Sequence, residues 1–298
     1  MKGIKMNTGT KIKSLRLERS MTQTELSAGH MTRNMLSLIE SGAAQPSLAT
    51  IQHLANKLGV APGYLLADEN EDVIYRKNMN MPSIRKAFVG GAFALCRELC
   101  LDALGDSQDD ETYLILAECS LGVAKEAFFR GNLRLACREF DVSCEYAGKT
   151  IYNTQRIFSE AAVFGKYMRR ISPSLYLESD TDVIMKGMAV SDGFCRYALA
   201  IEALDDDQTR IAEDYAGSGD FLCNHIRAKL YMKSGDFVAA YDCLKNLLNA
   251  DDNAIGAVMY DAFRELEQCC RENGDFKGAY EYSNAKVLML ERLLSDEI

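Results

Sequence analysis

The side chains in this sequence that could hold a metal ion are cysteines and histidines, and they occur in small groups. The candidate groups are Cys96 with Cys100, the adjacent Cys269 and Cys270, and Cys223 near His225. A structural zinc site needs ligands gathered at suitable spacings, and no paired CxxC set is present. We therefore interpret the ten cysteines as small buried apolar residues and expect neither a metal nor a cofactor.

The side chains that could carry out catalysis show no familiar arrangement either. The sequence contains no P-loop, no GxSxG and no HExxH motif. The acidic run Asp205-Asp206-Asp207 is typical of a solvated turn, and His30 and His53 have no matching ligands beside them. We expect that the protein is not an enzyme.

The composition favours helices. Hydrophobic residues make up 48% and charged residues 26% of the 298 residues, as in ordinary globular proteins, and only four prolines interrupt the chain. No uncharged apolar run approaches the roughly 18 to 20 residues of a membrane helix, and the first 13 residues lack the apolar core of a signal peptide. We expect an all-α protein of two domains in the cytoplasm, with reduced cysteines and no membrane partner.

Charge is divided unevenly along the chain. Residues 1–67 carry eight Lys and Arg against three Glu, a net charge of +5, although the whole chain has −9. The remainder therefore carries −14. A basic first segment joined to an acidic remainder is suited to a part that meets phosphate and a part that phosphate repels.

The basic segment has the signals of five short helices. Thr22 with Glu25 forms a capping box, Thr32 can cap a third helix that ends near Ser41 and Gly42, and Ser47 can cap a fourth. Gly59 stops that helix, and a last one runs from Pro62 to Ala67. Two short helices joined by a turn around Gly29 and His30 predict a helix-turn-helix.

This segment resembles the XRE family (Cro/C1-type), whose DNA-binding domain has the fold of lambda repressor. The matching stretches are Ile12–Arg16, Thr22–Ser27, Asn34–Gly42, Pro46–Leu48 and Leu54–Val60. From Thr22 to Ser37 the chain is one residue shorter than the usual family pattern, so helix 2 or the turn at Ala28-Gly29-His30 must be tighter.

The resemblance implies that the protein binds double-stranded DNA through the third helix in the major groove. It implicates Thr32, Arg33, Asn34 and Ser37 in reading bases, and Gln23 at the start of helix 2 in holding a phosphate. The same resemblance implies a salt bridge between Arg16 and Glu40 that ties helix 1 to helix 3. We interpret this pair as scaffold.

The rest of the chain contains an irregular repeat. We expect the DNA-binding domain at 1–67, a linker at 68–82, and helical repeats at 83–298 that begin at Pro82-Ser83. Gly131-Asn132-Leu133, Gly235-Asp236-Phe237 and Gly274-Asp275-Phe276 are each followed by an alanine five residues after the glycine. This pattern resembles the turn between the helices of tetratricopeptide (TPR) repeats, and predicts about five helical pairs stacked into an α-solenoid with a concave surface.

TPR-like pairs usually bind peptides or protein helices on the concave side. Candidate lining residues with amide, guanidinium or phenol groups are Asn153, Arg156, Asn224, Arg227, Tyr231 and Arg264. A chain with an XRE-type DNA-binding domain followed by TPR-like repeats is similar to the peptide-sensing regulators of the Rgg and PlcR type. That resemblance implies that the protein is a transcription regulator, that it forms a homodimer, and that its repeat domain senses a peptide or protein. The alternative is an interaction scaffold, or an antitoxin-like protein, that mainly binds a protein partner.

Overall fold

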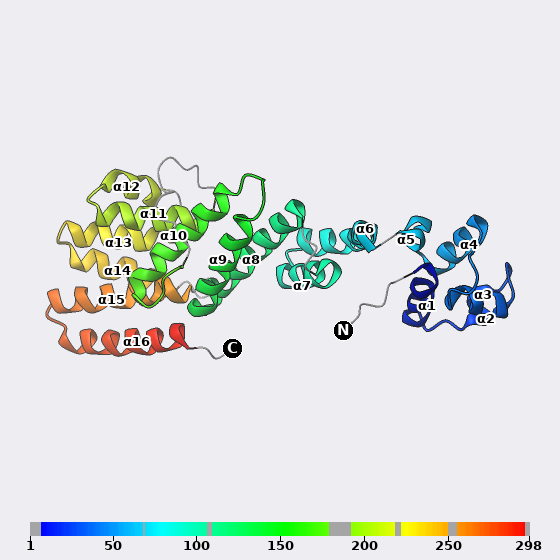
Figure 1. Ribbon diagram of the computed structural model, residues 1–298. Helices are drawn as coiled ribbons and strands as arrows, with labels where there is room; N and C mark the ends of the chain where they lie inside the picture. The colour runs from blue at the N-terminus through cyan, green and yellow to red at the C-terminus, as the bar shows by residue number, and fades with distance from the viewer. Residues whose placement is uncertain are drawn as a thin grey trace. The chain divides into compact units, whose positions relative to one another are not determined.

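The computed structural model describes residues 7–67, 69–105, 109–178, 192–217, 222–249 and 255–295, and these ranges contain α-helices and no strand (Figure 1). The chain divides into two compact units between Gln108 and Asp109. The all-α prediction is confirmed. No helix among these residues is long and apolar enough to span a membrane.

The N-terminal unit begins with five short helices: α1 (Thr8–Glu18), α2 (Gln23–Ser27), α3 (Arg33–Glu40), α4 (Leu48–Leu58) and α5 (Pro62–Leu66). Their ends are formed by local signals in the sequence. The hydroxyls of Thr22, Thr32 and Ser47 each accept a hydrogen bond from a backbone N–H of the first helical turn, and Gly59 ends α4 at φ +61°. One apolar core joins the five helices, with Ile12, Leu26, Leu36, Leu54 and Leu65 fully buried.

The segment after this bundle differs from the expected linker at 68–82. The described part of it belongs to α6 (Glu69–Val89), which continues through Pro82 and is followed by α7 (Phe93–Leu104). Met81 and Ile84 are buried, so the helix has an apolar face on either side of the proline. An acidic run favours the first turn of a helix as much as it favours a linker, because negative charge stabilises a helix N-terminus.

The C-terminal unit consists mainly of antiparallel helices joined by tight turns. They are α8 (Asp110–Arg130), α9 (Leu133–Ala147), α10 (Gln155–Ile171), α11 (Gly193–Asp205), α12 (Thr209–Ala216), α13 (Cys223–Lys233), α14 (Phe237–Leu248), α15 (Gly256–Glu272) and α16 (Phe276–Leu294). The helices α8 and α9, α11 and α12, α13 and α14, and α15 and α16 pack in pairs, and one apolar core runs through the unit.

The three glycine signatures are the turns inside three of these pairs. Gly131, Gly235 and Gly274 have φ of +86°, +82° and +78°. The side chain of the next residue, Asn or Asp, then caps the second helix of the pair. The alanines five residues after these glycines are buried, which lets the helices of a pair approach closely. These observations support the interpretation of a helical repeat.

The turn between α11 and α12 is a fourth copy that the glycine pattern did not reveal. Asp207 has φ +60° and stands where the other turns have glycine, and Ala212, five residues later, is fully buried. Asp is one of the few other residues that adopt this left-handed conformation readily. The acidic run at 205–207 is therefore the turn of a repeat.

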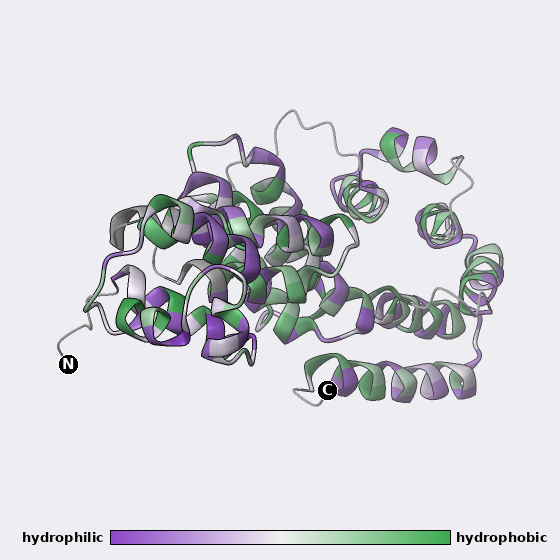
Figure 2. Cartoon of the chain, turned by 90° about the vertical axis from the view of Figure 1, so that its right-hand side faces the viewer, coloured by the Kyte–Doolittle hydropathy of each residue, from purple (hydrophilic) through white to green (hydrophobic). Residues whose placement is uncertain are grey.

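The pairs curl far enough for distant helices to meet. Helix α15 packs against α8 and α10 in addition to its neighbours α14 and α16. Figure 2 shows hydrophobic faces turned between the packed helices. Buried apolar side chains of α8, α10 and α15 fill the space where these helices meet.

Candidate nucleic-acid interface and ligand pocket

Helix α3 presents one solvent-exposed face and one buried face. Leu36 and Ile39 are buried in the core, whereas Arg33, Asn34 and Ser37 are exposed on the opposite side. The predicted residues of this helix are therefore brought together on one accessible surface, where a guanidinium, an amide and a hydroxyl lie within two helical turns. Leu38 borders this face and is about half exposed, which adds an apolar group that the sequence analysis did not single out.

Thr32 and Gln23 have additional structural roles. The Thr32 hydroxyl accepts a hydrogen bond from the Met35 N–H at 3.3 Å and so caps α3. The Gln23 amide Nε2 donates to Glu40 Oε2 at 2.8 Å. Each side chain keeps a further proton that could be donated to a ligand, so their predicted contacts with DNA stay predictions.

An ion pair fixes α3 to α1. The Arg16 guanidinium donates to both carboxylate oxygens of Glu40, at 2.7 and 3.0 Å, and to the Met21 carbonyl at 2.9 Å. Burial by itself raises the pKa of Glu40, but the hydrogen bonds from Arg16 and Gln23 outweigh it and hold this pKa below its usual value. The predicted scaffold pair is confirmed, and it sets the orientation of the exposed face of α3.

The shortened segment before α3 is accommodated by a short α2 and a tight turn. Helix α2 ends at Ser27, and Gly29 has φ +84°. The Lys57 ammonium, from α4, donates to the carbonyl oxygens of Glu25 and Ala28 at 2.9 and 2.6 Å and so satisfies the end of α2. No local pattern predicts this contact, because the lysine lies 32 and 29 residues from the two carbonyl groups in the sequence.

His30, in the same turn, stacks on His53 of α4 with ring centroids 4.6 Å apart. Desolvation, followed by the neighbouring charges of His30 and Lys57, lowers the pKa of His53. The stacked rings connect the turn before α3 to α4, and the lowered pKa of His53 favours its neutral form.

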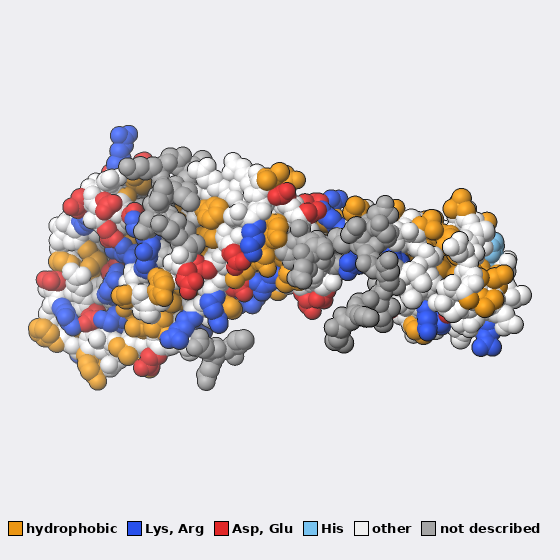
Figure 3. Space-filling view, in the orientation of Figure 1, with side chains coloured by type: hydrophobic (Ala, Val, Ile, Leu, Met, Phe, Trp, Pro, Cys, Tyr) orange, Lys and Arg blue, Asp and Glu red, His pale blue; other side chains and the backbone are white. Residues whose placement is uncertain are grey.

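Much of the positive charge of this segment is used inside the domain. Lys11 is buried, and its ammonium donates to the carbonyl oxygens of Tyr64 and Ala67 at 3.1 and 2.9 Å. Arg16 is paired with Glu40, and Lys57 caps α2. Figure 3 accordingly shows few Lys and Arg side chains on the visible face of these helices. The net charge of +5 overstates the positive charge that a phosphate could meet.

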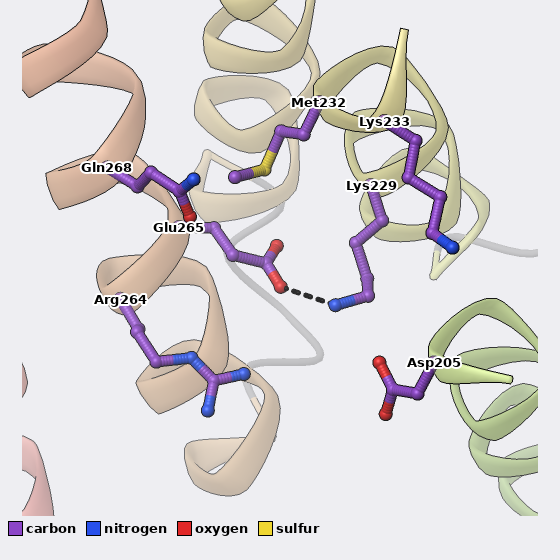
Figure 4. A pocket seen from close by; sticks show the side chains of 7 residues that line it. All are labelled: Asp205, Lys229, Met232, Lys233, Arg264, Glu265 and Gln268. Carbon is purple, nitrogen blue, oxygen red and sulfur yellow. Dashed lines mark hydrogen bonds and ion pairs between the residues drawn. The ribbon is translucent and has the colours of Figure 1, made fainter. Parts of the chain in front are cut away.

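In the C-terminal unit, a cavity of about 270 Å³ lies between α11, α13 and α15 (Figure 4). Its lining residues are Asp205, Lys229, Met232, Lys233, Arg264, Glu265 and Gln268. Of the six ligand residues predicted from the sequence, Arg264 lines this cavity. Figure 4 shows the Lys229 ammonium bonded to Glu265 and the Arg264 guanidinium beside it.

The other five predicted ligand residues do not line the cavity. The Asn153 side chain accepts from the Gln155 N–H at the start of α10, and Arg156 pairs with Glu118 and Glu160. Arg227 donates to the Ala216 carbonyl. At 100° per residue, Asn224, Arg227 and Tyr231 lie on a side of α13 away from Lys229 and Lys233. A ligand that contacts these three residues would therefore lie on a different surface of α13 from the one that borders the cavity.

A network of buried, hydrogen-bonded polar groups begins and ends at this cavity. Arg264 pairs with Asp261 at 2.8 Å, and Tyr167 donates to the other oxygen of Asp261 at 3.0 Å. Tyr167 and Tyr197 hydroxyls are 3.2 Å apart, and Tyr197 is 2.6 Å from His225 Nδ1. His225 Nε2 is 2.7 Å from Glu265, which accepts from Lys229 at 3.0 Å.

Ionised groups stand at both ends of this network, because Arg264 pairs with Asp261 and Lys229 pairs with Glu265. The two tyrosine hydroxyls and the His225 imidazole connect these ends. Burial of Glu265 opposes its ionisation, but the charges of His225 and Lys229 outweigh this and lower its pKa to about 2. The cavity itself is lined by three cations, Lys229, Lys233 and Arg264, and by two carboxylates, Asp205 and Glu265.

No group of three or more His, Cys, Asp or Glu side chains that could hold a metal ion occurs in the described ranges. Nine of the ten cysteines are buried, and all ten are free. Burial raises the pKa of Cys100 to about 12, which is the behaviour of a thiol packed among apolar residues.

Comparison with known families places the N-terminal bundle in a defined class. Residues 12–65 match the family model HTH_3, described as helix-turn-helix, and this range covers α1 to α5 from Ile12 onward. The bundle is a helix-turn-helix domain, as the sequence predicted.

Among solved structures, the chain is similar to PlcR of Bacillus thuringiensis, determined in complex with the peptide PapR7 and DNA. The two are 14% identical over 96% of each chain, and the TM-score is 0.28. No curated protein matches the sequence.

Proposed function

We propose that the protein is a DNA-binding transcription regulator that acts in the cytoplasm. The observation that carries the proposal is the exposed face of α3, where Arg33, Asn34 and Ser37 lie together on the second helix of a helix-turn-helix. The fork of Arg33 fits guanine O6 and N7, and the amide of Asn34 fits adenine N6 and N7. Leu38 can contact a thymine methyl group, Thr32 can donate to a base edge, and Gln23 can donate to a phosphate beside the groove.

The test compares two arginines in the full-length protein. Preferred sites are first selected from genomic DNA, and their affinities are then measured at several salt concentrations. Arg33→Ala is expected to lose about 5- to 150-fold on the preferred site, since a bidentate base contact discriminates by about 1–3 kcal/mol, and to keep its melting temperature. The control is Arg210→Ala, an exposed arginine of α12. Equal behaviour of the two variants, or no preferred site for the wild type, contradicts the proposal.

We further propose that the cavity between α11, α13 and α15 receives the end of a peptide ligand. Its volume of about 270 Å³ is near the lower limit of ligand pockets, so it suits one terminus of a peptide better than a whole chain. Lys229, Lys233 and Arg264 border it together with the carboxylates of Asp205 and Glu265, so cations outnumber carboxylates among its lining residues. These features favour a carboxylate, which an arginine can bind with two parallel hydrogen bonds.

The ligand proposal is tested by thermal unfolding with a library of short peptides, each made with a free and with an amidated C-terminus. A ligand present at about 100 times its Kd should stabilise the protein by about 2.7 kcal/mol. We expect the shift with the free carboxylate only, and its loss in Arg264→Gln. A shift that is equal for both forms of the peptide, or no shift across the library, argues against a carboxylate site.

A further inference from the structure

Helix α16 has an apolar surface on the side that faces away from its partner helix. Ala279 and Leu293 are buried where α16 packs in the unit, but Phe276, Tyr280 and Leu288 are 76%, 69% and 66% exposed. A helix face of a repeat array that packs against no neighbouring helix is normally polar. Figure 2 shows hydrophobic segments along this helix, up to its end near the C-terminus.

The exposed residues of α16 form a seam with a regular spacing. Lys277, Tyr280, Asn284, Leu288 and Glu291 follow one another at intervals of three or four residues, so they lie on one face of the helix. The rise of about 1.5 Å per residue separates the lysine from the glutamate by about 21 Å. A positive charge therefore stands near the beginning of the face and a negative charge near its end.

We propose that this face of α16 binds the same face of α16 in a second copy of the chain, in antiparallel orientation. With Asn284 on the twofold axis, Tyr280 packs on Leu288 of the second copy, and Lys277 meets its Glu291. A parallel arrangement would place lysine against lysine and glutamate against glutamate. The charge pattern thus fits a second copy and selects the antiparallel orientation.

The surroundings of the seam fit this partner. A groove of about 480 Å³ beside Phe276 and Tyr280 is also lined by Arg271, Ala279 and Ser283, and apolar side chains of the second copy can fill it. Within one chain the Lys277 ammonium is 3.8 Å from Glu281, and both side chains are mostly exposed. Such a surface pair contributes little, so Lys277 can turn to Glu291 of the second copy at low cost.

This inference deepens the proposed function, because a dimer presents two DNA-binding heads to half-sites about one helical turn apart. Its test does not use DNA, so the two can fail separately. The oligomeric state of the full-length protein is measured by sedimentation equilibrium, with helicity followed by circular dichroism. We expect a dimer for the wild type and at least a ~10-fold weaker dimer for Leu288→Arg with unchanged helicity.

Reversal of charge tests the orientation. Lys277→Glu and Glu291→Lys should each weaken self-association by about tenfold, because each places like charges opposite one another. The double variant Lys277→Glu/Glu291→Lys should dimerise like the wild type. A mixture of the two single variants should form a heterodimer, since both contacts are then opposite in charge. Arg210→Glu is the control for a change of net charge.

A monomeric wild type overturns the inference. A dimer that withstands Leu288→Arg and both charge reversals overturns it as well. A dimer that is weakened by the single reversals but is restored neither by the double variant nor by the mixture refutes the antiparallel pairing.

Discussion

The ion pair between Arg16 and Glu40 should be among the strongest single contributions to the stability of the helix-turn-helix. In Glu40→Ala, the Arg16 guanidinium, whose side chain is only 9% exposed in the wild type, loses two hydrogen bonds at 2.7 and 3.0 Å. Removal of one partner from a buried pair costs about 3–5 kcal/mol, because the other charge remains without compensation. Domains of this kind are stable by about 5–15 kcal/mol, so the loss is a large part of the total.

Hydrogen exchange of amides in α1 and α3, followed by mass spectrometry on the full-length protein, gives the free energy of local opening. The expected loss corresponds to about 150- to 5,000-fold faster exchange. In Arg16→Met/Glu40→Leu no unpaired buried charge remains, and we expect a cost within about 2 kcal/mol. Glu18→Ala, which removes an exposed carboxylate of α1, is the control.

Two results would refute this reasoning. One is a loss of less than about 1 kcal/mol in Glu40→Ala, the value of an exposed pair. The other is a double variant as unstable as the single one, which would mean that packing and not charge is responsible. The pair should also respond to pH. Because the folded-state pKa of Glu40 is lowered, its stabilisation is present above about pH 4.3 and is lost as the pH falls further.

Three further predictions concern other parts of the chain. The folded-state pKa of His53 is lowered, so the N-terminal unit should lose stability as the pH falls below about 6.5, and hydrogen exchange should show a smaller loss in His53→Gln. Gly235→Ala should cost about 1–2 kcal/mol in urea unfolding, since φ is +82° and the space around it is open, whereas Gly193→Ala, also in open space but without positive φ, should be neutral or slightly stabilising. Tyr167→Phe should cost about 1–3 kcal/mol in the same assay, because it removes one hydrogen-bond partner from the buried carboxylate of Asp261 and one from the Tyr197 hydroxyl, and an unchanged midpoint would show that the polar network is not needed for stability.

The sequence was sufficient to predict those structural features that depend on neighbouring residues. Thr22, Thr32 and Gly59 predict helix ends, because a cap involves only the next few residues. Helix α2 begins after Thr22, α3 begins after Thr32, and α4 ends at Gly59. The same holds for the three glycine turns of the repeats. The exposed face of α3 followed from the helical period once its N-cap was known.

Features that depend on contacts between distant segments could not be predicted in this way. Asp207 takes the place of a glycine, so the acidic run at 205–207 was predicted as a turn but not as a turn of the repeat. The partner of Tyr167 in the buried network is Asp261, which is 94 residues away. No local pattern indicates that α10 and α15 meet. For the same reason five of the six proposed ligand residues were placed on the inner surface by analogy, and only Arg264 lines the cavity.

The use of charge inside the helix-turn-helix gives dimerisation a physical role in the proposed function. Lys11, Arg16 and Lys57 donate to carbonyl or carboxylate oxygens of the domain itself, so among residues 7–67 three other cations, Lys13, Arg19 and Arg33, are left to displace the counterions of DNA. One head should therefore bind DNA weakly. Two heads held together gain effective concentration at the second half-site without any new contact. On this argument, Leu288→Arg should reduce affinity for a full operator far more than affinity for a single half-site, and the difference should shrink when the protein concentration is raised.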